Sequence, residues 1–145
     1  MKEAICHESG HAIVGRALGY TVVKMELRQG FPRTVVDFDS ATENSVSKQC
    51  VILAAGAAAE ITVFGAFDDR ACACDQKMIF DRGGEEISTY FPKAQELLKS
   101  HHNNFRRLRE RLSHEWIEAQ SGLLPDSDSF ELMDQKEFER FWIGE

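Results

Sequence analysis

Most hydrophobic positions in this chain recur with the 3.6-residue spacing of helices. Residues 3–19 are apolar on nearly every side and end at Gly19, a frequent helix stop, so they predict a largely buried first helix. Residues 45–64 predict a second helix, and its centre, residues 50–59, is uncharged and rich in alanine. Because a helix without a polar face has to be covered by protein, we expect this second helix at the centre of the fold.

One short part alternates between apolar and polar residues, which is the spacing of strands. Residues 21–38 contain two such stretches and predict a two-stranded β-ribbon. Such a ribbon is stable only if it packs against helices. A helix starting within residues 72–82 and a long amphipathic helix over residues 92–120 follow, and in the latter apolar side chains recur every seven residues. Residues 121–145 predict a tail with a turn around Pro125 and a last short helix. The predicted fold is a single, mainly α-helical domain of five to six helices with a small two-stranded β-ribbon.

Composition and charge restrict the expected partners and location. The 145 residues are 43% hydrophobic and 28% charged, which is typical of one soluble globular domain, and the net charge of −7 argues against a nucleic-acid partner. The longest uncharged apolar run, residues 50–59, is too short for a membrane segment. The cysteines Cys6, Cys50, Cys72 and Cys74 do not form a secreted disulfide pattern, and no signal peptide is apparent, so we expect a cytoplasmic protein.

The first helix carries the strongest chemical signal. His7 and His11 are four residues apart and therefore project from one helix face, with Glu8 beside them. This His-Glu-x-x-His pattern supplies two ligands and a general base in zinc hydrolases. The alternative is two core histidines bonded to backbone carbonyls, with Glu8 at the surface. We favour the metal site, because three polar groups in a buried helix need partners.

A catalytic zinc site needs a third protein ligand, and the sequence offers several. One extended pattern requires a glycine and a third histidine further along the first helix, but Val14 and Ala17 occupy those positions. The carboxylate candidates are Glu43, Glu60 and Asp75, the last of which lies where a loop turns into a helix.

Cysteines near these carboxylates are softer candidate ligands. Cys72 and Cys74 would suit a closed structural zinc site, but then Glu8 would have no role. Glu60 has two further interpretations: it marks the point where the second helix reaches water, or it holds a ligand histidine as an outer partner.

The motif region also resembles a known family. Residues 7–16, His-Glu-Ser-Gly-His-Ala-Ile-Val-Gly-Arg, resemble the His-Glu-Ala-Gly-His-Ala helix of the FtsH-type ATP-dependent zinc peptidases (peptidase family M41). Residues 54–65 are similar to that family's Gly-Gly-Arg-x-Ala-Glu-Glu stretch and its closing glycine, and Asp75 falls where the family has an aspartate ligand. The likeness is strong around the motif, fair over residues 50–80 and weak beyond them.

The resemblance implies a mainly helical zinc metallopeptidase that hydrolyses unfolded or loosely folded polypeptides. His7, His11 and Asp75 would hold Zn²⁺, Glu8 would be the general base, and Glu60 would have a supporting role. This sequence contains no Gly-x-x-x-x-Gly-Lys-Ser/Thr motif, so ATP dependence does not carry over. Folded substrates would therefore require a separate ATPase or unfoldase.

One departure from the family motivates a rival interpretation. The approach to Asp75, residues 70–74, reads Arg-Ala-Cys-Ala-Cys where the family is rich in glycine, serine and threonine. The alternative is a non-catalytic binding or regulatory module on a peptidase fold, with a structural metal or none. The sequence leaves the oligomeric state and the physiological substrate open.

Overall fold

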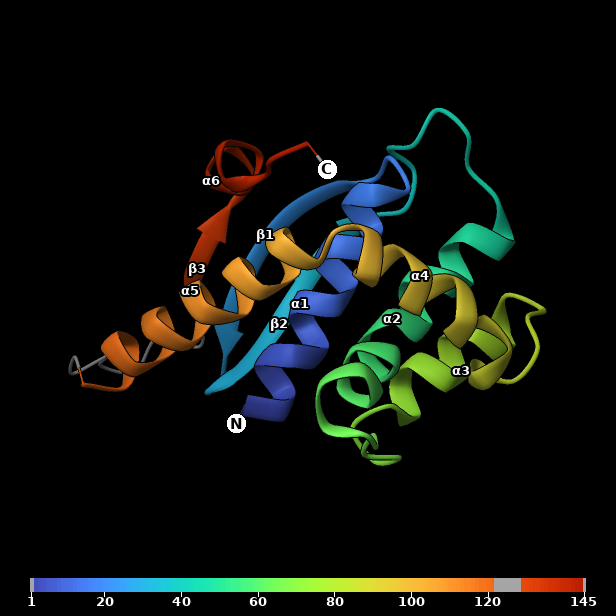
Figure 1. The fold of residues 1–145 in the computed structure, drawn as a ribbon, viewed down its shortest axis with the longest axis horizontal. Coiled ribbons are helices and arrows are strands. Elements are labelled where there is room, and N and C mark those ends of the chain that lie inside the picture. Colours follow the sequence, from blue (N-terminus) through green and yellow to red (C-terminus); the bar gives the residue numbers. More distant parts are fainter. Residues whose placement is uncertain (1, 122–128, 145) are drawn as a thin grey trace.

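The computed structural model of the chain describes residues 2–121 and 129–144, and within them the fold is mainly helical with a small antiparallel sheet, which confirms the predicted fold class (Figure 1). The turn expected around Pro125 lies outside these ranges. The elements are, in order, α1 (Lys2–Ala17), β1 (Thr21–Arg28), β2 (Phe31–Asp37), α2 (Val46–Phe64), α3 (Ala73–Asp81), the 3₁₀-helix η1 (Ile87–Tyr90), α4 (Phe91–Ser100), α5 (His102–Ser121), β3 (Ser129–Asp134) and α6 (Gln135–Phe141).

The centre of the fold is the pair α1 and α2, which lie against each other beside the sheet (Figure 1). Glycine makes this contact close: a Cβ on Gly10 would lie 2.5 Å from the main-chain oxygen of Ala55 and 2.7 Å from the Cβ of Ala59. Such distances leave no room for a side chain, so the two backbones approach further than larger residues would allow.

α2 is covered by protein along its middle. Its uncharged centre, residues 50–59, is buried throughout. The helix begins at an N-cap, Ser45, whose Oγ accepts a hydrogen bond from the N–H of Lys48, and it ends at Gly65 in the left-handed conformation with φ 82°. By length and composition alone α2 could also cross a membrane, but a core helix passes the same test, and this one is largely buried inside the protein.

The β-ribbon has a third strand that the sequence interpretation omitted. β1 pairs antiparallel with β2 on one side and with β3 on the other, which gives the order β2-β1-β3 and leaves β2 at an edge. β3 buries Leu132 and Met133, and α6 follows directly with Phe138 fully buried. The described part of the tail, residues 129–144, therefore contributes to the core.

The segment expected as one long helix consists of two, α4 and α5. The first ends at Ser100, and His101 has non-helical angles of φ −114° and ψ 34° before the second begins. The physical reason is that the two halves cover different partners: α4 packs mainly on α2, whereas α5 packs on α1. One straight helix could not follow both surfaces.

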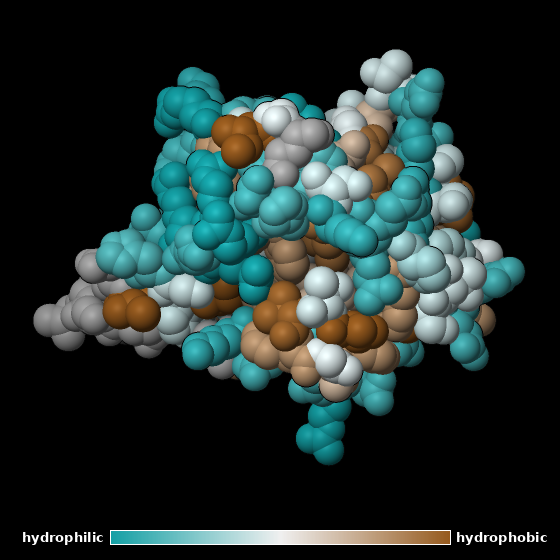
Figure 2. All heavy atoms as spheres, in the orientation of Figure 1, coloured by the Kyte–Doolittle hydropathy of each residue, from teal (hydrophilic) through white to brown (hydrophobic). Residues whose placement is uncertain are grey.

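Charged and polar side chains cover most of the face in Figure 2, and hydrophobic residues are exposed mainly between the N-terminal end of α1 and the C-terminal end of α2. A hollow of about 510 Å³ lies there, lined by Ile5, Val63 and Phe64 among others. A second hollow, between α1, β2 and α3, is the one that contains the histidines.

The α1–α2 contact predicts a steric effect on stability. Gly10→Ala should lower the free energy of unfolding by about 1–3 kcal/mol, because the new methyl group overlaps the backbone of α2. Urea unfolding monitored by circular dichroism measures this change. Gly15→Ala is the matched control on the same helix, since its Cβ would meet nothing closer than 3.4 Å and alanine favours helices by up to about 1 kcal/mol. Equal stabilities of the two variants would contradict the close packing.

Candidate metal centre

His7 and His11 lie on the face of α1 that is turned toward α2 and α3. Both are buried, and their ring centroids are 4.7 Å apart. Their Nε2 atoms approach to 3.0 Å. The four-residue spacing thus brings two ring nitrogens to one point, as the helix geometry requires.

Acceptors on α2 face the Nδ1 atom of each histidine ring, on the side opposite Nε2. His7 Nδ1 lies 2.9 Å from Glu60 Oε2, and His11 Nδ1 lies 2.7 Å from the carbonyl oxygen of Ile52. A carbonyl and a carboxylate only accept hydrogen bonds, so each Nδ1 carries a proton and donates it. In the neutral rings both Nε2 atoms therefore present lone pairs, which is the tautomer that ligates a metal.

Asp75 completes the group from the first turn of α3. Its Oδ2 lies 2.9 Å from His7 Nε2 and 3.3 Å from His11 Nε2. Nitrogen and oxygen ligands of a tetrahedral zinc, each at 2.0–2.1 Å from the metal, are about 3.3 Å apart. The three atoms thus fit three corners of such a site, and the fourth corner would remain for water or substrate.

The charges of the cluster shift the pKa values of its members. Burial lowers the pKa of His7, but the acceptors Asp75, Cys72 and Glu60 outweigh it and raise this pKa to about 12. Burial likewise opposes a charge on Asp75, yet the two histidines hold the pKa of its carboxyl well below the usual range. The pKa of His11 is raised in spite of its burial, chiefly by the charge of Asp75. The Nε2 edge therefore stabilises positive charge, which either protons or a metal cation can supply.

Glu8 lies at the mouth of this group. Its Oε1 accepts a hydrogen bond of 2.7 Å from the main-chain N–H of Thr34 on β2, and the Thr34 hydroxyl donates to the carbonyl of Glu8 at 2.8 Å. The second carboxylate oxygen lies 3.9 Å from His7 Nε2. These residues open into a cleft of about 530 Å³, lined also by Val36 and Met78.

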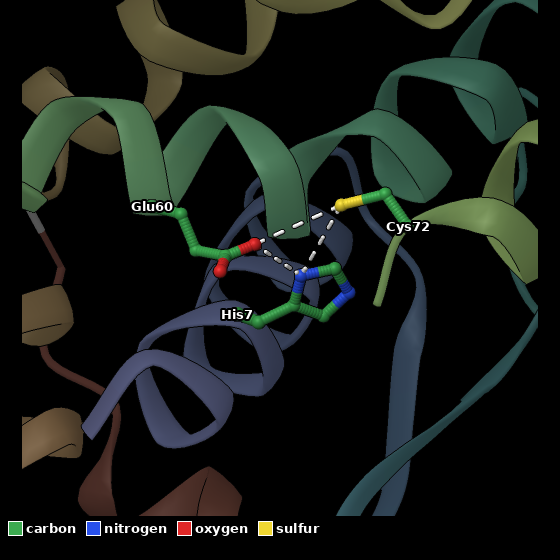
Figure 3. A group of neighbouring side chains, drawn as sticks. All are labelled: His7, Glu60 and Cys72. Atoms are coloured by element: carbon green, nitrogen blue, oxygen red, sulfur yellow. Dashed lines mark hydrogen bonds and ion pairs between the residues drawn. The ribbon is translucent and has the colours of Figure 1, made fainter. Parts of the chain in front are cut away.

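A second group of possible ligands occupies the Nδ1 edge of His7. Glu60 Oε2 and Cys72 Sγ lie on that side, with Sγ 3.9 Å from Nδ1 and 3.7 Å from Oε2 (Figure 3). All three residues are buried, and together they could hold a metal ion. Cys72 thus belongs to a different edge of the ring from Asp75.

Two sequence candidates belong to neither group of possible ligands among the described residues. The Glu43 side chain is 90% exposed and pairs with Lys48 at 3.6 Å. Cys74 is exposed and lines the cleft, whereas its neighbour Cys72 is buried. Among the residues that the structure describes, Cys74 is in neither group of possible ligands. The pairing of the two cysteines in one structural zinc site, considered from the sequence, therefore finds no support here.

Three contributors to the site were not identified from the sequence. The Ile52 carbonyl orients His11, and Thr34 holds Glu8. Gly56 on α2 faces the His7 ring, because a Cβ there would overlap the ring atoms Cε1 and Nε2. The small residues of α2 indicated that a neighbouring helix approaches closely, but they did not indicate that the His7 imidazole occupies the space at Gly56.

Neither a protein-family model nor a curated protein sequence matches this chain. The likeness to the FtsH-type peptidases therefore stays a resemblance of motifs, and the chemistry of the site has to be argued from its own residues.

The role of Asp75 as a candidate third ligand can be tested by charge removal. Asp75→Asn should lower the affinity for Zn²⁺ by more than about tenfold, since even outer-shell changes cost about 10–100-fold. Competition with a chromophoric chelator measures the affinity. Asp69→Asn, in the exposed loop before α3, is the control and should bind as wild type does. An Asp75→Asn protein with wild-type affinity would rule out this carboxylate as a ligand.

The lack of room for a side chain between Gly56 and the His7 ring gives a second prediction. Gly56→Ala should displace the His7 ring and reduce the affinity for Zn²⁺ by about tenfold or more, while the protein remains helical. The same chelator titration measures it, with circular dichroism as the check on folding. Gly15→Ala, which adds the same methyl group to α1 beside Val36, should leave the affinity unchanged. Equal affinities in both variants would show that the ring position does not depend on Gly56.

Proposed function

We propose that this protein is a zinc-dependent endopeptidase that hydrolyses unfolded or loosely folded polypeptides. The observation that carries the proposal is the convergence of three ligand atoms, His7 Nε2, His11 Nε2 and Asp75 Oδ2, within 3.3 Å of one another. A carboxylate suited to act as a base, Glu8, lies at their edge. This combination of three protein ligands and a neighbouring acid is the usual donor set of a catalytic zinc.

The donor set fits zinc in charge as well as in spacing. His7, His11 and Asp75 would hold the ion, and Glu60 and the Ile52 carbonyl would keep both histidines in the ligating tautomer. When bound, zinc lowers the pKa of a coordinated water toward neutrality and polarises a scissile carbonyl.

Glu8 would perform the proton transfer. One of its oxygens accepts a hydrogen bond from the Thr34 N–H, which favours the orientation of the carboxylate toward the cleft. The other oxygen is directed toward the histidine cluster. We assign to Glu8 the acceptance of a proton from the attacking water and its delivery to the leaving amine.

The edge strand β2 would bind the substrate. β2 has β1 on one side only, and several of its residues, among them Thr34 and Val36, line the cleft. An extended peptide could add to this edge as a further strand, with its scissile bond beside Glu8. A separate ATPase or unfoldase would be needed for folded substrates, because only an extended chain fits this mode.

The resemblance to FtsH-type peptidases supports the same assignment. The motif residues that carry the resemblance, His7, Glu8 and His11, are among those that converge here. The resemblance would give Asp75 the role of the family's third ligand. We therefore propose membership of that class of peptidases, without its ATPase activity.

The proposed base can be tested directly. Glu8→Gln should reduce cleavage of unfolded casein by about 100-fold or more while the variant still binds one zinc, because the amide cannot accept the proton. Fluorescent-casein hydrolysis and metal analysis of the same preparation measure both quantities. Glu96→Gln, an exposed acid on α4, is the matched control. A Glu8→Gln protein that cleaves casein at the wild-type rate would refute the role of Glu8, and a zinc-loaded wild type without activity would favour the non-catalytic alternative.

A further inference from the structure

We propose that His7 Nδ1, Glu60 and Cys72 form a second metal site, which takes a thiophilic divalent cation and excludes metal from the Nε2 edge of His7. The two sites would share one imidazole ring and use its opposite nitrogens. The second site would thus act as an inhibitory site for the first.

The geometry of the Nδ1 edge fits a metal as well as that of the Nε2 edge does. A tetrahedral zinc with one sulfur ligand at about 2.3 Å separates that sulfur from nitrogen or oxygen ligands by about 3.6 Å. The Sγ of Cys72 lies 3.9 Å from Nδ1 and 3.7 Å from Oε2, and the nitrogen and oxygen are 2.9 Å apart (Figure 3). Shifts of a few tenths of an ångström would bring all three atoms to ligand spacing.

The donor set differs from that of the Nε2 edge in softness. A thiolate prefers thiophilic metals such as Zn²⁺ and Cd²⁺, whereas the carboxylate of Asp75 does not discriminate in their favour. All three side chains are buried and come from separate parts of the chain: His7 from α1, Glu60 from α2 and Cys72 from the residue before α3. The fold therefore brings together a group that a sequence motif does not define.

The tautomers of His7 make the two sites mutually exclusive. A neutral imidazole has one lone pair, so the nitrogen that carries the proton cannot ligate a metal. When a metal binds Nδ1, the Nδ1 proton leaves and the proton of the neutral ring lies on Nε2, where Asp75 accepts its hydrogen bond. Cys72 loses its thiol proton to solvent as Sγ bonds the metal, so one proton is released if His7 starts neutral and two are released if it starts as the imidazolium. His7 can then no longer bind a metal through Nε2.

Inhibition by thiophilic metals follows if the Nε2 site is the catalytic one, and this step alone rests on the proposed function. The existence of the Cys72 site does not rest on it. Metal binding and catalysis can therefore be tested separately.

The test is a Cd²⁺ titration of metal-free protein, followed by the thiolate-to-cadmium absorption in the ultraviolet. Wild type and Cys74→Ser should develop this band with one equivalent of Cd²⁺, and Cys72→Ser should not. Cys74 is the matched control because it lies two residues away and is exposed. A band retained in Cys72→Ser, or absent from wild type, would overturn the proposal.

A second measurement avoids dependence on the folding of Cys72→Ser. Cadmium-edge X-ray absorption of the Cys74→Ser protein should show one sulfur among the ligands, and a shell of nitrogen and oxygen only would overturn the site. Zinc-dependent casein cleavage by the wild-type protein reports separately on the proposed function. Loss of the sulfur signal with retained cleavage would refute only the second site, and the converse would refute only the peptidase.

Discussion

The close approach of α1 to α2 is the constraint on which the rest of the structure depends. One helix carries both histidines, and the other carries both acceptors of their Nδ1 protons, Glu60 and the Ile52 carbonyl. A hydrogen bond of 2.7–2.9 Å between two helices survives only if the backbones stay at a fixed separation. Gly10 and Gly56 make that separation short enough. The packing of small residues between α1 and α2 therefore determines which nitrogen of each imidazole carries the proton, in addition to stabilising the core.

Three helices make different contributions to the electrostatics of the candidate site. α1 supplies the histidines, α2 sets their tautomer, and α3 brings the negative charge of Asp75 to the Nε2 edge. The buried carboxylate of Glu60 is tolerated because His7 donates to it, since an unpaired charge at that depth would be costly. β2 contributes from the open side by holding Glu8. The acids around His7 thus differ in role because they reach different atoms, although they are chemically similar.

Local patterns in the sequence predicted the helices well, and long-range pairing less well. The apolar character of residues 50–59 indicated a central helix before any contact was known. The break at His101 was missed because Leu98, Phe105 and Leu112 keep a seven-residue spacing through it and are all buried. The seven-residue spacing shows which side of each helix faces the core, but it does not show that the helix axis changes direction at His101. β3 was missed because its partner, β1, is about a hundred residues earlier in the chain, so pairing rather than local propensity creates the strand.

The residues of the candidate site could be predicted from the sequence, but their arrangement around the His7 imidazole ring could not. His7, Glu8, His11, Glu60, Cys72 and Asp75 all stood out by type and spacing, yet nothing in the sequence says which nitrogen of His7 each would face. That depends on how the chain enters α3, which places Cys72, the residue before the helix, at one edge and Asp75, three residues later in the first turn, at the other. Because an imidazole can offer only one lone pair while it is neutral, this placement decides which ligands act together. Side chains with the type and spacing of metal ligands therefore act as one site only if the tautomer of the shared imidazole lets them bind together.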